Sequence, residues 1–593
     1  MERLNILSRR ALGFVAVGAV ATLLLSACGG GGDGGGGGDA KFNQGVESIV
    51  NKSDKKGGSL RYAIASNMES TDPGNTYYGY VWNFSRYYAR TLYTYDVGPK
   101  EAGHKVVPDL ADGEPEISDD GKTYTIKIKP GMKYEDGSEI VAEDFAYAVA
   151  RSNFGEQALP NGPKYYADYL AKSEDYKGPY DNPDDPLKGF GGVEVKDETT
   201  LVFHLNRPFA DFPFVLVQPQ SAPVPADKDK GEQYQTKVLS SGPYKFDGEW
   251  NPGSGLKLVR NDEWDAESDP VRKALPDKVS VEEGVDQNEI DQRLQNGDLD
   301  VDLGGRGLGP AAKGTALTDD AVKANLDNPE SGAHNYMAVN TKVKPFDKIE
   351  CREAIQWAND RTSTQRAWGG DVGGTISSQL LPPSVPGADA KINPFKTKGD
   401  KGNVEKAKQA LADCGEEGGL DVNLGVRSDR PEEVAAAEAI QQSLKKADIN
   451  VNIRKFPSDT FTNTQAGSPS FVKKNKLALS IYGWMPDWNT GFGYMSQIMH
   501  GDAIKKAGNS NLAELDAPEV NKLLDESQET QDEGERNKMY TEADQKIMES
   551  ATVAPLVFQK SVLYRPETLT NVYFSETWKM YDYMALGTTA GGE

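Results

Sequence analysis

Hydrophobic and polar positions alternate along parts of this chain and recur at helical spacing in others. Residues 123–129 alternate polar and apolar side chains, which predicts a half-buried strand. Residues 422–426 and 449–453 are two further apolar-rich strands. Between them, residues 431–447 carry apolar side chains three and four positions apart, as one face of a helix does. A strand, a helix and a strand of these lengths predict a βαβ unit with parallel pairing.

Two more segments show helical spacing. Residues 518–550 are highly charged, carry a stripe of apolar side chains and are predicted to be helical with a break near Gly534. Ala142 begins a predicted helix that runs to about Arg151, with acidic residues in its first turn, where the helix dipole favours them. Together these patterns predict an α/β protein with mixed β-sheets flanked by helices and with more than one domain.

The first 27 residues have the pattern of an export signal. Arg3, Arg9 and Arg10 precede a run of apolar and small side chains over residues 11–25. That run is shorter than the roughly 20 apolar residues of a membrane-spanning helix. We therefore predict a cleaved signal peptide over residues 1–27, with the choice between general secretory and twin-arginine export left open.

The segment Leu25-Ser26-Ala27-Cys28 resembles the lipobox of bacterial lipoproteins. The resemblance implies a lipid on Cys28 and cleavage just before it; the alternative is an ordinary signal peptide with an incidental cysteine. Gly29 to Gly38 is a glycine-rich run that cannot pack and suits a flexible tether. We predict a tether over residues 28–56 and a lipid-anchored protein on the outer, extracellular face of the cytoplasmic membrane.

Charge and histidine content exclude several kinds of partner. The formal net charge is −24, and removal of residues 1–27, with three arginines and one glutamate, leaves about −26. Such a chain is repelled by nucleic acid and by anionic lipid surfaces. The only histidines are spread along the chain without metal-ligand spacing, so we predict no metal site and no cofactor.

Three cysteines are present. With lipid on Cys28, Cys351 and Cys414 remain as a pair in an oxidising compartment, which favours a disulfide. Two buried free thiols are the alternative, because the sequence alone does not set the distance between them.

Short segments along about 500 residues resemble, in order, the dipeptide- and oligopeptide-binding proteins of ABC importers, which are family 5 of the extracellular solute-binding proteins. They are Gly57-Gly58-Ser59-Leu60-Arg61-Tyr62, Asp72-Pro73, Pro108-Asp109-Leu110-Ala111, residues 118–124, residues 131–138 with 142–145, Ser241-Gly242-Pro243-Tyr244, Val259-Arg260-Asn261, Phe346-Asp347 with residues 352–355, residues 405–408 and Tyr564-Arg565-Pro566. Matching segments in matching order indicate the family far more specifically than any one segment does.

The resemblance implies a two-lobed, type II periplasmic-binding-protein clamshell with an extra third domain. Lobe 1 (domain I) is expected over residues 57–83, 201–333 and 553–593, with the extra domain (domain II) at 84–200. Lobe 2 (domain III) is expected at 334–552, joined by a hinge of two crossing segments. A ligand that contacts both lobes shifts the protein toward the closed form. The resemblance also implies a monomer that docks on ABC permease subunits.

In the family, the carboxylate that binds the peptide amine lies just after a Gly-Trp pair. Here the matching segment is Gly483-Trp484-Met485-Pro486-Asp487-Trp488, which implies Asp487 as the amine ligand. A buried ammonium needs such a partner; the alternative role for Asp487 is to cap a turn after Pro486. This chain departs from the family at Asn489-Thr490, where a second Asp-Pro is usual.

Other candidate ligand contacts are aromatic or polar residues near the expected cleft. Each has an alternative role in core packing or in a turn. Arg366 and Arg427 could receive a carboxylate, although a surface role is favoured for both. The candidates are Trp484, Trp488, Tyr77, Tyr78, Tyr80, Trp82, Ser66, Asn67 and Trp368.

The sequence therefore favours a binding protein for short peptides rather than an enzyme. There is no Gly-x-Ser-x-Gly motif, no His-Glu-x-x-His motif and no phosphate-cradling Gly-x-x-x-x-Gly-Lys-Ser/Thr loop. Within the same fold, the alternative ligand is a non-peptide solute such as a glycan or nickel chelate, or a peptide signal. A secreted hydrolase with a carboxylate pair is the distant alternative.

Overall fold

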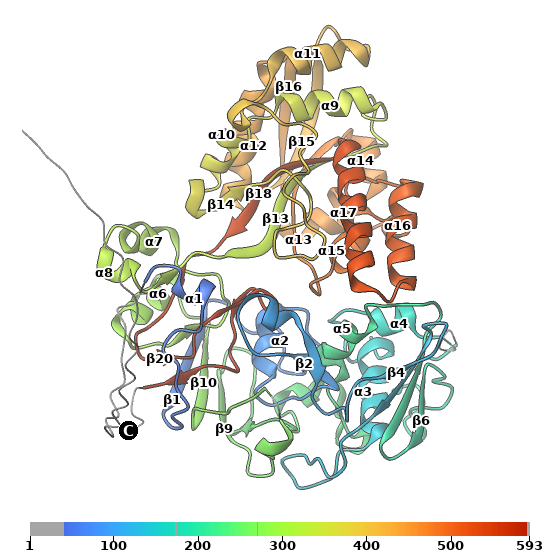
Figure 1. Ribbon diagram of the computed structural model, residues 1–593, viewed down its shortest axis with the longest axis vertical. Helices are drawn as coiled ribbons and strands as arrows, with labels where there is room; N and C mark the ends of the chain where they lie inside the picture. The colour runs from blue at the N-terminus through green and yellow to red at the C-terminus, as the bar shows by residue number, and fades with distance from the viewer. Residues whose placement is uncertain (1–40, 172, 174, 270, 590–593) are drawn as a thin grey trace, which may run out of the picture. The chain divides into compact units, whose positions relative to one another are not determined.

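The computed structural model describes residues 41–589 except 172, 174 and 270 (Figure 1). The predicted signal peptide, Cys28 and residues 28–40 of the predicted tether lie outside the described residues. In the part of the chain that is described, no helix is both long enough and apolar enough to cross a membrane.

A five-stranded mixed sheet is built around the first strand of the chain. Its order is β11-β1-β10-β9-β8, with β1 parallel to β10 and β11 and the other pairs antiparallel. Helix α6 (Gln287–Asn296) connects β10 to β11 and buries Ile290 and Leu294 beside β1. The strands are β1 (Ser59–Ile64), β8 (Tyr244–Phe246), β9 (Leu256–Arg260), β10 (Lys278–Glu283) and β11 (Val301–Asp302).

A four-stranded antiparallel sheet contains the alternating segment. The strand predicted at 123–129 is confirmed as β5 (Thr123–Lys127), which buries Tyr124 and Ile126. Helix α3 (Ala142–Phe154) ends three residues later than predicted. Strand β7 begins at residue 200, the last residue predicted for domain II, and continues past it. Because β7 pairs with β5 along its whole length, it belongs to the same sheet as β5. The remaining strands are β4 (Glu116–Ile117), β6 (Val193–Asp197) and β7 (Thr200–His204) in the order β4-β5-β7-β6.

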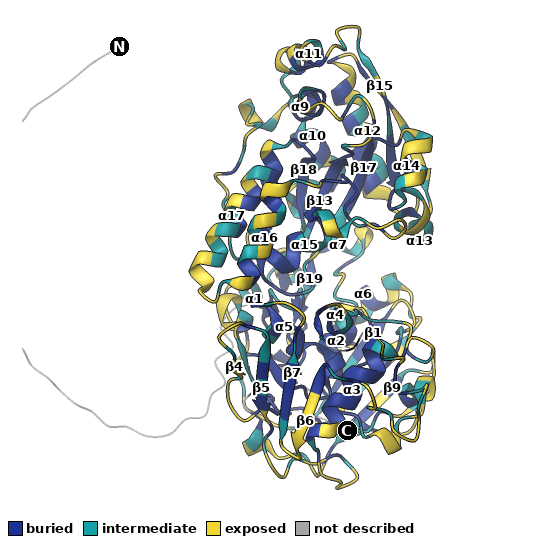
Figure 2. Ribbon diagram, turned by 90° about the vertical axis from the view of Figure 1, so that its right-hand side faces the viewer, coloured by how far each residue is buried: buried dark blue, intermediate teal, exposed yellow. Residues whose placement is uncertain are grey.

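The predicted βαβ unit is confirmed inside a six-stranded mixed sheet. Strand β15 (Leu420–Arg427) is parallel to β16 (Ile449–Phe456), and α12 (Pro431–Lys445) packs on both. Figure 2 shows the central strands of this sheet as buried. The full order is β14 (Gly374–Ile376), β18 (Val553–Lys560), β13 (Glu330–Val339), β17 (Leu479–Trp484), β15 and β16.

Strands β13 and β18 lead into and out of this sheet. The sequence predicts residues 553–560 in lobe 1, and that prediction is wrong, because β18 lies between β13 and β14. The pairing continues past both strands, where β12 (Leu326–Asp327) is antiparallel to β19 (Leu563–Tyr564). From here on, lobe 1 means residues 41–329 and 561–589, and lobe 2 means residues 330–560.

Three helices of lobe 2 lie beside one another: α15 (Gly491–Met499), α16 (Pro518–Glu529) and α17 (Glu533–Glu549) (Figure 1). The predicted break near Gly534 falls at residues 530–532 instead, because Asp532 caps α17 by accepting a hydrogen bond from the Glu535 N–H. Figure 2 shows buried and exposed faces along both α16 and α17, as their apolar stripe predicts.

The prediction of a flexible tether over residues 28–56 extends too far. Its end includes folded residues, because Gln44–Glu47 form helix α1 and Val50 is buried beside Val572. The Gly45 N–H donates to Asp327 over 2.9 Å, and a side chain at Gly45 would collide with that carboxylate. These contacts fix residues 44–50 on lobe 1.

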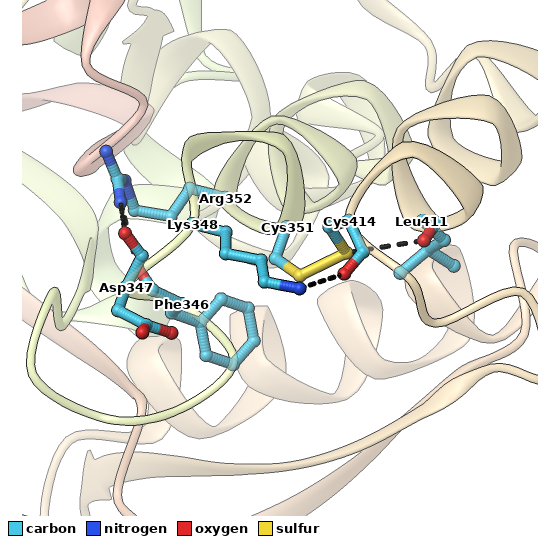
Figure 3. Close-up of a disulfide and its surroundings, with 7 residues drawn as sticks. All are labelled: Phe346, Asp347, Lys348, Cys351, Arg352, Leu411 and Cys414. Carbon is cyan, nitrogen blue, oxygen red and sulfur yellow. Dashed lines mark hydrogen bonds between the residues drawn. A yellow bond between two sulfur atoms is a disulfide. The ribbon is translucent and has the colours of Figure 1, made fainter.

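Cys351 and Cys414 form a disulfide in lobe 2 with a Cα–Cα distance of 5.5 Å (Figure 3). It joins α9 (Ile349–Ala358) to α11 (Val404–Asp413), and both cysteines are buried. Lys348 adds a hydrogen bond from Nζ to the Cys414 carbonyl over 2.7 Å. Two helices about 60 positions apart in the chain are thus covalently joined.

Candidate functional site

The loop at residues 485–490 lies where lobe 1 and lobe 2 meet. Strand β17 ends at Trp484, and α15 begins at Gly491. Thr490 caps α15, since its Oγ1 accepts the Gly493 N–H over 2.9 Å. The loop therefore runs from a central strand of lobe 2 to the first of the three neighbouring helices, with its residues presented toward lobe 1.

Asp487 is held by two tyrosines of lobe 1. The Tyr77 hydroxyl donates to its Oδ2 over 2.9 Å, and the Tyr165 hydroxyl, from α4 (Tyr165–Tyr169), donates to the same oxygen. No Lys, Arg or His forms an ion pair with Asp487 within the described ranges. Burial raises the pKa of the Asp487 carboxyl, and the two hydroxyls offset part of that rise. The site thus has a carboxylate without a cation.

The aromatic loop near residue 80 supplies one of these tyrosines. Tyr77 is 46% exposed and stacks on Trp82 with ring centroids 5.8 Å apart. Trp82 is buried and donates from Nε1 to the Thr76 carbonyl over 3.1 Å. Tyr78 is exposed, and its ring centroid lies 5.6 Å from that of the half-buried Tyr80. Of the four candidates, Tyr77 contacts Asp487, and Trp82 supports Tyr77.

The two tryptophans of the Asp487 loop differ in environment. Trp484 is partly exposed, and its Nε1 has no hydrogen-bond partner among residues 41–589 as described. Its ring lies 6.2 Å from that of Tyr482. Trp488 is buried between the lobes, packs edge-on against Tyr165 at 4.9 Å and donates from Nε1 to Asp211 over 2.7 Å. Trp488 is therefore a lobe-to-lobe contact.

Four other candidates have their contacts elsewhere. Ser66 and Asn67 are exposed just after β1, and the Ser66 carbonyl accepts the Gly284 N–H over 3.3 Å. Trp368 is buried at the end of α10 (Arg361–Ala367), in the core of lobe 2. Arg427 pairs with Glu433, with 3.0 Å between Nε and Oε2. The structure brings none of these four into contact with Asp487.

Sequence reasoning missed two residues of this site, Tyr165 and Asp211. Tyr165 lies in a segment without periodicity, 322 positions from Asp487. Asp211 is a lone acid between Phe209 and Phe212. An acid in an apolar run is costly to bury without a partner, and this pattern could have marked Asp211.

Comparisons with known proteins agree with this architecture. The sequence profile of the bacterial extracellular solute-binding proteins, family 5 (middle region), matches residues 105–506. The oligopeptide-binding protein OppA of Bacillus subtilis (strain 168) is 26% identical over 506 residues, which cover 79% of this chain and 84% of that protein.

Solved structures are also similar. The clavulanic acid biosynthesis oligopeptide binding protein 2 is 36% identical, with a TM-score of 0.89, covering 93% of this chain and 99% of that one. The DppA protein of Helicobacter pylori, solved in complex with the peptide STSA, is 20% identical with a TM-score of 0.66. It covers 91% of this chain and 99% of its own, and at this identity it supports the fold alone.

Proposed function

We propose, from the premise that this chain belongs to family 5 of the bacterial extracellular solute-binding proteins, that it captures short peptides outside the cell for an ABC importer. Its α/β fold with mixed sheets is that of the type II periplasmic binding proteins. The family binds solutes, and we propose no catalytic role for this member. Peptide as the ligand is supported by the relatives named for oligopeptides.

The observation that carries the proposal is the Asp487 carboxylate, which faces lobe 1 and has two hydroxyl donors but no cation as partner among the residues that the structure describes. A peptide brings an ammonium, and a partly buried carboxylate is the partner that an ammonium needs when it leaves water. We propose that the ammonium replaces one or both tyrosine hydroxyls at Asp487. Tyr77, Tyr78 and Trp484 are proposed to contact the remainder of the ligand.

Closure of the two lobes is the proposed link between binding and transport. The sheets suggest three domains: the five-stranded and four-stranded sheets in lobe 1 and the six-stranded sheet in lobe 2. The paired segments β12–β13 and β18–β19 are the proposed hinge. A ligand held by both lobes favours the closed form, which we propose docks as a monomer on the permease subunits.

The proposed location is the outer face of the cytoplasmic membrane. The family is extracellular, and the lipobox-like segment before Cys28 supports a lipid anchor at that residue. Residues 29–40 are then the proposed tether between the lipid and α1. Globomycin-sensitive processing and labelling of Cys28 by a lipid analogue would test the anchor, and a Cys28→Ser variant released into the medium is the expected outcome.

Thermal unfolding of residues 39–593 with peptides of about two to six residues tests the ligand. Each peptide is offered with a free and with an acetylated amine. At a peptide concentration of 100 Kd, selective binding stabilises the native state by about 2.7 kcal/mol. We expect free-amine peptides to raise the Tm of the wild type, and acetylation or the Asp487→Ala substitution to abolish the shift.

A matched control is Asp421→Ala, an exposed carboxylate on the same sheet, which should leave the shift intact. Acetylated peptides that stabilise as well as free ones would remove Asp487 from its proposed role. If no peptide shifts the Tm, the peptide assignment fails, and glycans and metal chelates become the next ligands to test.

A further inference from the structure

Asp211 connects the two lobes next to the loop that carries Asp487. It precedes α5 (Phe212–Val217) in lobe 1 and is 0% exposed. Its Oδ2 accepts two hydrogen bonds from lobe 2, one from Trp488 Nε1 over 2.7 Å and one from the Thr490 hydroxyl over 2.5 Å. One carboxylate oxygen of lobe 1 therefore holds both ends of the segment 488–490.

The backbone at this point is also held by lobe 2. The Ala210 N–H donates to the Gln528 carbonyl over 3.0 Å, and the Asp211 N–H donates to the Gln528 side chain over 3.1 Å. Gln528, on α16, donates in turn to the Tyr540 hydroxyl over 3.2 Å. Asp211 therefore sits in a docking point built from several elements and is not an isolated contact.

Asp487 and its neighbours depend on these lobe 1 contacts for their position. Met485 in the same loop is 49% exposed. Asn489 donates to the Ser384 carbonyl of lobe 2 over 2.8 Å, and its amide lies 3.2 Å from His104 Nδ1 of lobe 1. With Trp488 and Thr490 bound to Asp211, most polar contacts of residues 487–490 come from across the lobe boundary.

The energetics of Asp211 indicate why these contacts matter for closure. Burial raises the pKa of the Asp211 carboxyl, and its Oδ1 has no hydrogen-bond partner in the described chain. A buried carboxylate is costly unless its hydrogen bonds are made. Both donors belong to lobe 2, so the hydrogen bonds that compensate the burial of Asp211 require the two lobes to be in contact.

We infer that Asp211 is a positioning residue, which orders the Asp487 loop only when the lobes close and so couples closure to assembly of the amine site. Asn489-Thr490, where the family pattern has a second Asp-Pro, fits this role, because Thr490 supplies one of the two donors. The effect on peptide affinity rests on the proposed function. The contact itself and its effect on closure do not.

A double-mutant cycle in the ligand-free protein tests the contact. Asp211→Ala, Thr490→Val and the double variant are compared by urea unfolding of residues 39–593. Because one hydrogen bond joins the two side chains, we expect the double variant to be less destabilised than the sum of the single ones. Additive effects under conditions in which spin-label distances show the lobes closed would overturn the inference.

Distance measurements and affinity test the coupling. Spin labels at Lys196→Cys in lobe 1 and Lys445→Cys in lobe 2, both exposed in the structure, report closure. Thr490→Val should lower the closed fraction and weaken peptide binding by about tenfold, the effect of losing one hydrogen bond to a carboxylate, and Asp211→Ala, which removes both accepted hydrogen bonds, should do so at least as strongly. Asp544→Asn is the matched control: it is equally buried, but its hydrogen bonds to the Leu380 and Leu381 N–H groups lie within lobe 2.

The outcomes separate the two proposals. If the Asp211 variants match Asp544→Asn in label distances and affinity, Asp211 is only structural and the inference fails. If the wild type binds no peptide, the proposed ligand is wrong, and the label distances and the cycle decide the role of Asp211 alone.

Discussion

His334 and Asp544 hold the same segment of lobe 2 from two sides, and their titrations have opposite effects on stability. The neutral His334 ring donates from Nδ1 to the Leu380 carbonyl and accepts at Nε2 from Ser377, both over 2.9 Å. Burial lowers the pKa of His334 to about 3, because its imidazolium would lose water. Burial raises the pKa of Asp544 to about 6, although two backbone N–H groups favour its carboxylate.

The direction in which each group changes stability with pH follows from whether the native or the unfolded state binds the proton. Below pH 6.5 the unfolded chain protonates His334 and the native state does not, so the stability that the neutral ring contributes is lost as the pH falls. Asp544 stays protonated in the native state up to about pH 6, so its contribution is lost as the pH rises from about 4. Each site changes the free energy of unfolding by up to about 1.4 kcal/mol per pH unit in that range.

Urea unfolding at three pH values between about 4 and 6 checks this. His334→Asn should lower the slope of unfolding free energy against pH, and Asp544→Asn should raise it. Each variant serves as the control for the other, since both lose a contact to the same segment. Parallel curves for the wild type and both variants would mean that neither group changes its pKa on folding.

At the residue scale, the sequence predicts Asp487 and Tyr77 as candidate ligand contacts but not Tyr165 and Asp211, which lie beside them. Asp487 could be predicted because it lies within a recognisable motif, and Tyr77 could be predicted because aromatic residues cluster around it in the sequence. Tyr165 and Asp211 became visible only in the structure, since hydrogen bonds across 322 and 277 positions leave no local pattern. The role of Trp488 as a lobe-to-lobe contact was missed for the same reason.

At the element scale, the disulfide between α9 and α11 should contribute strongly to the stability of lobe 2 (Figure 3). Its cysteines are 63 positions apart, so the crosslink closes a long loop in the unfolded chain. The loop-entropy treatment gives about 4 kcal/mol for a loop of this length. We expect Cys351→Ala with Cys414→Ala to lower the Tm by several degrees, as calorimetry of the oxidised proteins would show.

Reduction provides the control for that substitution. Dithiothreitol should lower the Tm of the wild type toward that of the double variant and leave the double variant unchanged. An equal Tm for oxidised and reduced wild type would show that the bond adds nothing to stability, as when the unfolded chain is already compact near these helices.

Elements with a clear period were predicted best. The strand at β5 and the unit β15–α12–β16 follow from local alternation and helical spacing. The break between α16 and α17 was displaced, because the Asp532 cap decides where α17 begins and Gly534 is tolerated in its first turn. The tether was extended too far, since α1 is short and is fixed by distant residues such as Asp327.

At the scale of the whole molecule, the order of the matching segments along the chain predicts the fold class but not every boundary between the lobes. Matching segments in matching order indicated two lobes, and the three main sheets agree with an α/β architecture. Residues 553–560 were assigned to the wrong lobe, because a strand that returns to a sheet is placed by its partner, here β13. Pairing between distant strands is therefore the information that the one-dimensional pattern lacked.

The net charge of −24 predicts how the whole molecule responds to salt. Exposed ion pairs such as Lys100–Glu47 and Lys273–Asp54 contribute little, and salt screens them. Repulsion among the excess carboxylates acts over longer distances and is screened as well. Since repulsion dominates, we expect the Tm at pH 7.5 to rise when NaCl increases from about 10 to 150 mM, by scanning calorimetry. At a pH near 4.8, where the net charge vanishes, the same addition should have no such effect. A Tm that falls with salt at pH 7.5 would mean that local ion pairs outweigh the net repulsion.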